Sequence, residues 1–144
     1  MTTPTHITAA ARGWIGTPYR HQASVKGAGA DCLGLIRGVW REIYGSEPEA
    51  VPAYSPGWAE GGGTEALAAA ARRNLVEIPP TEFRDGDVLL FRWRPHLPAK
   101  HAGIAVSATR MIHAQEDASV TEIFLSSWWC RHLAFAFRFP GVDA

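Results

Sequence analysis

The order of the helical and strand patterns constrains this chain more than any other feature of its sequence. Up to Asn74 apolar residues recur at the three- and four-residue spacing of helices, whereas from Leu75 onward short apolar runs separated by turn residues indicate strands. Helices that precede strands, instead of alternating with them, favour an α+β fold. The length of 144 residues and the hydrophobic content of 47% fit one domain, residues 1–144, with a substantial core.

The expected elements follow from these patterns and from the turn residues between them. We expect helices over residues 5–15, 31–44 and 64–74, the last capped by Thr64, and a short helical turn over residues 126–131. Strands are expected over residues 75–78, 88–91, 100–106, 110–114, 120–124 and 133–139, and the last strand is expected to close the sheet. Residues 46–63, rich in Pro and Gly, are predicted to form a long surface loop, which is often functional.

Cys32 lies at the predicted start of the second helix. The preceding Asp31 is a good N-cap, since its carboxylate can accept hydrogen bonds from the free N–H groups of the first helical turn. Cys32 is therefore the first residue inside the helix, where the positive end of the helix dipole favours the thiolate and lowers the pKa. The alternative is that Cys32 is a small buried hydrophobic residue. Gly34 and Gly38 on the same helix predict close approach by a neighbouring strand.

Two histidines occur on neighbouring predicted strands, residues 100–106 and 110–114. A turn centred near Ser107 would place His101 directly opposite His113 in an antiparallel hairpin, with both rings on one face and within hydrogen-bond reach. A cysteine at a helix start, a base on one strand and an orienting group on the next strand is the arrangement of a thiol hydrolase. His21 and His96 are predicted to be ordinary loop residues.

Four segments of the chain resemble, in the same order, the motifs of the NlpC-type, papain-like cysteine peptidases. These segments are residues 31–35, 85–91, 101–104 and 112–114, and the resemblance extends from about residue 5 to residue 139. It is closest to the branch of the family that is carried in phage tails and gene transfer agents. The resemblance implies a papain-like fold, with amino-terminal helices packed on a carboxy-terminal antiparallel sheet. Leu33 departs from the pattern, because most members carry a small hydroxyl residue at that position.

The resemblance also implies a mechanism and a substrate. Cys32 is the expected nucleophile, His101 the base and His113 the group that orients the base, while Tyr19 is expected to bring its hydroxyl near the reacting centre. Asp31 is a further candidate for substrate binding. The implied substrate is a stem peptide of bacterial peptidoglycan, cleaved between D-glutamate and the diamino acid. No cofactor or metal is implied.

Two other interpretations remain open. Cys32, His101 and His113 could bind zinc with water in the fourth position, although no His-Glu-x-x-His or Cys-x-x-Cys pairing supports it. The chain could also be a non-catalytic structural module of a tail tip, although competent residues at all three positions argue against that interpretation. Cys130 has neither a cap nor a glycine loop before it, so we predict a structural role there and free thiols at both cysteines.

Composition and the amino-terminal residues limit the partners that we expect. Basic and acidic side chains number 14 each, so the net charge is zero, which argues against general binding to nucleic acid or a membrane surface. No secretory signal and no apolar run of membrane-spanning length is visible. We therefore expect a protein that is made in the cytoplasm and reaches the cell wall in a phage-like tail, with tail or baseplate proteins as partners. Release with a holin is the alternative.

Overall fold

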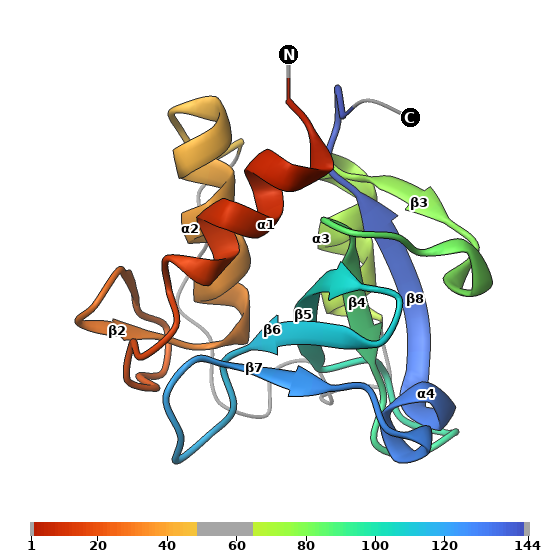
Figure 1. Ribbon diagram of the computed structural model, residues 1–144. Coiled ribbons are helices and arrows are strands. Elements are labelled where there is room, and N and C mark those ends of the chain that lie inside the picture. Colours follow the sequence, from red (N-terminus) through yellow and green to blue (C-terminus); the bar gives the residue numbers. More distant parts are fainter. Residues whose placement is uncertain (1, 49–64, 143–144) are drawn as a thin grey trace.

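The structure, a computed structural model, describes residues 2–48 and 65–142. It is α+β, as the order of the patterns predicted, and its main sheet is antiparallel with the order β3-β8-β4-β5-β6-β7 (Figure 1). The helices are α1 (Pro4–Arg12), α2 (Cys32–Tyr44), α3 (Ala66–Asn74), η2 (Pro80–Glu82) and α4 (Ser127–His132). The strands are β1 (Ser24–Val25), β2 (Gly29–Ala30), β3 (Val76–Ile78), β4 (Val88–Phe91), β5 (His101–Ser107), β6 (Arg110–His113), β7 (Thr121–Phe124) and β8 (Leu133–Arg138).

Both faces of the main sheet are covered. Helices α1 and α2 pack on each other and on β5, and α3 packs against β3 and β8 (Figure 1). Because successive side chains of a strand point to opposite faces, β4 divides its residues between two clusters. Val88 and Leu90 pack on the helical side, and Leu89 and Phe91 pack on the far side. None of the helices in residues 2–48 and 65–142 is both long and apolar enough to cross a bilayer.

Helix α2 has the predicted bounds because the sequence marks both of its ends. The Asp31 carboxylate accepts a hydrogen bond from the N–H of Gly34 at 2.7 Å, and Gly45 ends the helix with a φ of 92°. The approach of a neighbouring strand to the two helix glycines was predicted wrongly. A Cβ on Gly34 would meet the backbone carbonyl of Ala23 in the preceding loop, and one on Gly38 would meet the indole of Trp14.

Helix α1 is shorter than predicted, since it ends at Arg12 and is followed by Gly13. A turn ends at Gly16, which has a φ of 92°, and its N–H donates to the carbonyl of Val120 at 2.8 Å. This turn directs Trp14 into the core while Ile15 remains 46% exposed. The prediction that Ile15 belongs to the buried face of the helix was therefore wrong.

Strand β8 is the last strand of the sequence but lies inside the sheet, between β3 and β4 (Figure 1). It pairs with both neighbours in antiparallel register, and its partner on β4 shifts between Leu90 and Phe91. The last strand, which was expected to close the sheet, thus completes it from within. Most of the predicted loop over residues 46–63, and the predicted cap Thr64, lie outside the described residues.

Candidate active site

The thiol of Cys32 lies where α2 begins beside the start of β5. Its Sγ donates to the Lys100 carbonyl at 3.8 Å, and the N–H of Ala102 lies close enough to favour the thiolate. The thiol therefore contacts the backbone on both sides of His101. Glu65, which precedes α3, supports this stretch of backbone because its carboxylate accepts the N–H of Ala99 at 2.9 Å.

Burial reverses the charge that the helix dipole predicts for this cysteine. Loss of water raises the pKa of the Cys32 thiol to about 12, and the neighbouring Asp31 carboxylate adds to the rise. The backbone N–H groups of Ala102, Leu33 and Cys32 itself act in the opposite direction but do not overcome burial. The predicted lowering of the thiol pKa is therefore wrong for this resting state, in which Cys32 is a neutral thiol.

The rings of His101 and His113 are hydrogen-bonded, with 2.8 Å between Nε2 of the first and Nδ1 of the second. Their strands are not in the predicted register, since His113 pairs with Gly103 and not with His101. The turn lies later than Ser107, which belongs to β5, and the pairing shifts by two residues. A shift of two keeps both rings on one face, and Gly103 has no side chain to separate them.

Burial also keeps both imidazoles uncharged. His101 is 6% exposed and His113 is 2% exposed. Loss of water, with smaller contributions from His113 and from the positive charge of Lys100, lowers the pKa of His101 to about 3. Burial alone lowers the pKa of His113 to about 4. In the described part of the chain no hydrogen bond joins Cys32 to His101, and the site rests with a neutral thiol and a neutral imidazole pair.

Aromatic side chains from two other segments contact this imidazole pair. Trp93, in the loop after β4, stacks on His101 with ring centroids 5.4 Å apart and planes 27° apart. Trp129, on α4, lies 5.6 Å from His101 and 5.3 Å from His113. Neither tryptophan was predicted from the sequence to be part of the site. The adjacent pair Trp128 and Trp129 was a visible signal, but no spacing rule connects it to His101.

Tyr19 is held beside the start of α2 through its backbone. It forms a parallel bridge with Ala30, two residues before Cys32, and its N–H donates to the carbonyl of Ala118 at 3.2 Å. Burial, together with the negative forms of Cys32 and Asp31, raises the pKa of Tyr19 to about 12. The hydroxyl therefore stays protonated and can donate a hydrogen bond near the thiol. Its catalytic role remains a prediction.

Asp31 is buried and its carboxylate is occupied by backbone groups. One oxygen accepts the N–H of Gly34 and the other accepts the N–H of Gln22, each at 2.7 Å. His21 lies in the same loop, with its Nδ1 3.8 Å from this carboxylate. These contacts favour a structural role for Asp31 in shaping the loop before Cys32, instead of the predicted substrate contact.

The second cysteine lies on α4 and is exposed. Both Cys32 and Cys130 are free thiols, and the Cys130 sulfur contacts the carbonyl of Leu125 at 3.7 Å. Within residues 2–48 and 65–142, no three His, Cys, Asp or Glu side chains come together as a metal site requires. The described geometry therefore gives no support to the zinc-hydrolase interpretation.

Comparison with known proteins identifies related sequences. A model described as the NlpC/P60 family matches residues 16–138. Gamma-DL-glutamyl hydrolase of Bacillus subtilis (strain 168) is 28% identical over 134 residues, which are 92% of this chain and 28% of that protein. The chain thus spans less than a third of the length of this relative.

Solved structures share the fold of this chain. The NlpC/p60 domain of the peptidoglycan hydrolase SagA has a TM-score of 0.68 at 24% identity, over 96% of this chain and 100% of that one. RipD of Mycobacterium tuberculosis, a non-catalytic NlpC/p60 domain protein adapted to peptidoglycan binding, has a TM-score of 0.60 at 14% identity, over 96% and 98%. At these identities the similarity establishes the fold, which catalytic and non-catalytic proteins share.

Proposed function

Because the chain belongs to the NlpC/P60 family, we propose that it is a cysteine peptidase that hydrolyses amide bonds in the peptides of bacterial peptidoglycan. The observation that carries the proposal is the hydrogen-bonded pair of His101 and His113, together with the contact of the Cys32 sulfur with the backbone that precedes His101. Nε2 of His101 is engaged by His113, so Nδ1 is the atom that remains to take the thiol proton. A nucleophile, a base and an orienting group are then supplied by α2, β5 and β6 in turn.

The neutral resting state requires that proton transfer accompany attack. Nδ1 of His101 removes the thiol proton as the Cys32 sulfur bonds to the amide carbon, and the carbonyl electrons move to its oxygen. Backbone N–H groups at the start of α2 and the hydroxyl of Tyr19 stabilise that oxyanion. The imidazolium then protonates the leaving amine, and a thioester remains. Water, deprotonated by His101, hydrolyses the thioester and releases the Cys32 thiol.

The bond that we propose joins D-glutamate to the diamino acid of the stem peptide. The similarity to a gamma-DL-glutamyl hydrolase supports an acyl group derived from glutamate. Digestion of purified sacculi, followed by mass analysis of the released fragments, tests this choice. A glutamate at the new carboxyl end is expected, and fragments cut elsewhere in the stem would contradict it.

The proposed activity is tested by comparing matched variants on peptidoglycan. Wild-type protein and Cys130→Ser should release soluble fragments from sacculi, whereas Cys32→Ala and His101→Ala should release none. Circular dichroism confirms that each variant is folded. A folded wild-type protein that binds sacculi without cutting them would instead establish a binding module, which is the function described for the related fold of RipD.

We also propose that the protein acts from a phage-like tail, in contact with tail or baseplate proteins, and reaches the cell wall by being carried there. The support is the resemblance of the four ordered motifs to those of peptidases carried in phage tails and gene transfer agents. Mass spectrometry of purified particles tests this location. If the protein is present only in the lysate and its release depends on a holin, the alternative route, release with a holin, is favoured.

A further inference from the structure

The His101–His113 pair is contacted by several aromatic rings. Trp93 stacks on His101, while Phe91 lies 6.2 Å from the same imidazole. Trp129 meets His113 edge-on, with planes 87° apart. These rings come from three segments that are separate in the sequence, namely β4, the loop after β4, and α4.

The distances show that both tryptophans lie on the same side of His101. The centroids of Trp93 and Trp129 are 5.9 Å apart, and they lie 5.4 Å and 5.6 Å from His101, so the three rings form a nearly equilateral triangle. Trp129 also forms a second triangle with the two imidazoles, whose own centroids are 5.0 Å apart. One indole therefore contacts both members of the pair, and the other fixes the plane of the base.

We propose that Trp93 and Trp129 are positioning residues that hold the His101–His113 pair in one hydrogen-bonded orientation and shield it from water. Stacked and edge-on contacts at these distances are favourable beyond their buried area, and indoles are too large to be displaced by solvent. The effect of these two tryptophans on catalysis rests on the proposed function. Their effect on the two imidazoles is a property of the protein without substrate.

The groups that face the pair explain why its shielding has a measurable effect. Lys100, directly before β5, and the neighbouring His113 oppose protonation of His101, and the thiol of Cys32 on α2 contacts the Lys100 carbonyl. Phe91, Trp93 and Trp129 contribute no charge and exclude water. Removing an indole admits water, so the imidazolium form becomes easier to reach and the pKa values of both histidines rise.

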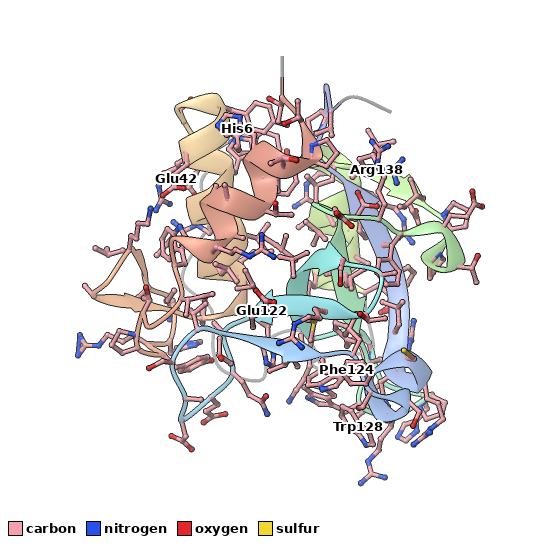
Figure 2. The ribbon with its side chains drawn as sticks, viewed as in Figure 1. His6, Glu42, Glu122, Phe124, Trp128 and Arg138 are labelled. Carbon is pink, nitrogen blue, oxygen red and sulfur yellow. The ribbon has the colours of Figure 1, made fainter. Side chains whose placement is uncertain are left out.

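Trp128 provides a matched control for this cover. It lies on the same helix, at the end of the molecule where α4 is seen in Figure 2, and is 43% exposed. It contacts both Trp93 and Trp129, at 5.7 Å and 5.0 Å, and stacks on His132. Among the described ring contacts it touches neither His101 nor His113. Trp128→Leu therefore perturbs the aromatic cluster without uncovering the imidazole pair.

The first test follows the histidine ring resonances by NMR as the pH of the free, full-length protein is lowered. Trp93→Leu and Trp129→Leu should shift the titration of the pair to higher pH, while Trp128→Leu should leave it unchanged. Trp93→Phe and Trp129→Phe keep an aromatic ring and should give intermediate shifts. They should also stay folded, even where the leucine variants do not. Titrations in the phenylalanine variants that match the wild type would overturn the proposal.

The second test separates positioning from simple structural support. On sacculi or a soluble stem peptide, the tryptophan variants should lose about 10- to 100-fold in kcat with KM changed by less than about threefold. The acid limb of their pH profile should move to higher pH, because the base is protonated more easily. An unchanged acid limb in a folded variant would contradict the proposal. An inactive wild type would refute the proposed function, while the NMR titration would still decide the role of the tryptophans.

Discussion

Cys32 and His101 rest in their uncharged forms because loss of water disfavours the charged form of each side chain and no ion pair between them is found in the described residues. The rise in the pKa of the thiol and the fall in that of the imidazole act in the same direction. The proton of the Cys32 thiol therefore stays on sulfur in the protein without substrate. This arrangement protects the thiol from adventitious electrophiles, since only the thiolate reacts rapidly.

Alkylation of Cys32 should depend steeply on pH. In a Cys130→Ser background, the rate of reaction with iodoacetamide should rise about tenfold per pH unit between pH 6 and 8, since the thiolate fraction rises in that proportion below the pKa. Peptide mass mapping measures the rate, and urea-unfolded protein provides the control. A rate that is rapid and constant over this range would indicate a preformed thiolate–imidazolium pair.

Substitutions of His113 should separate orientation from proton transfer. The amide of Asn can occupy nearly the position of Nδ1, so His113→Asn should keep a partner for His101 and stay within about tenfold of wild-type activity. His113→Ala removes the partner and should lose about 100-fold or more, while Cys32→Ala and His101→Ala should lose all activity. The measurement is the initial rate of fragment release from sacculi. Equal and complete loss in His113→Asn and His101→Ala would show that His113 itself transfers a proton.

The Asp31 cap before Cys32 and the contact between the two imidazoles could be predicted, because each depends on a local rule. The capping role of Asp31 depends only on the helix that follows it, and the two histidines share a face under any register shift of two residues. The charge states could not be predicted in the same way. They depend on desolvation by Trp93 and Trp129, which reach the site from segments that no local pattern connects to it.

At the scale of the elements, α2 is fixed against its neighbours by its two glycines. Gly34 lies against the backbone of the loop before β1, and Gly38 lies against the indole of Trp14. This close contact lets α1 and α2 approach each other while α2 also packs on β5. Asp31 sets Cys32 at the start of α2, and the same packing places that helix against β5.

Gly38→Ala should destabilise the protein by about 1–3 kcal/mol, although alanine is the better helix former, because the added methyl overlaps the Trp14 ring. Urea unfolding followed by circular dichroism measures the loss. The same substitution in a Trp14→Phe background should cost less, because the smaller ring leaves room for the methyl. Equal losses in the two backgrounds would place the strain elsewhere.

The bounds of α2 were predictable and the end of α1 was not, for a physical reason. Asp31 and Gly45 are strong signals at both ends of α2. After Arg12 either Gly13 or Gly16 could end α1, and the choice is made by the burial of Trp14 against Gly38. The residue at which α1 ends is thus decided by a contact between two elements, and it cannot be read from the sequence of either element alone.

For the whole molecule, the buried imidazoles make stability sensitive to acid. Their folded pKa values of about 3 and about 4 lie below the unfolded value near 6.5. The stability that they contribute is therefore present above about pH 6.5 and is lost as the pH falls through 4 toward 3. Cys32 has the opposite sign, and its contribution is lost as the pH rises from about 8.5 toward 12.

The free energy of unfolding should thus fall more steeply with acid in the wild type than in a variant without these rings. Each imidazole that is protonated only in the unfolded state adds about 1.4 kcal/mol per pH unit to the slope. Urea unfolding at pH 7, 6 and 5 should show wild-type slopes that exceed those of the His101→Gln, His113→Gln double variant by up to about 2.7 kcal/mol per unit. Parallel curves would mean that the two histidines are not buried in the neutral form.

The α+β class followed from the order of helices and strands, but the order of strands in the sheet did not. Adjacent patterns predict the β5–β6 hairpin, because the turn between them is short. The pairing of β8 with both β3 and β4 spans a long stretch of sequence and leaves no local signal. Its alternating Phe135 and Phe137 indicate a strand, without indicating which neighbours it joins.

The interior place of β8 has a consequence for protein synthesis. Translation at about 5–20 residues per second takes roughly 2–8 seconds to proceed from Phe91 to Leu133. Throughout that interval Val88–Phe91 is an entirely apolar strand with one edge open to other nascent chains on the same messenger RNA. We expect slow codons between these positions to lower the soluble yield while every residue of the finished protein stays the same.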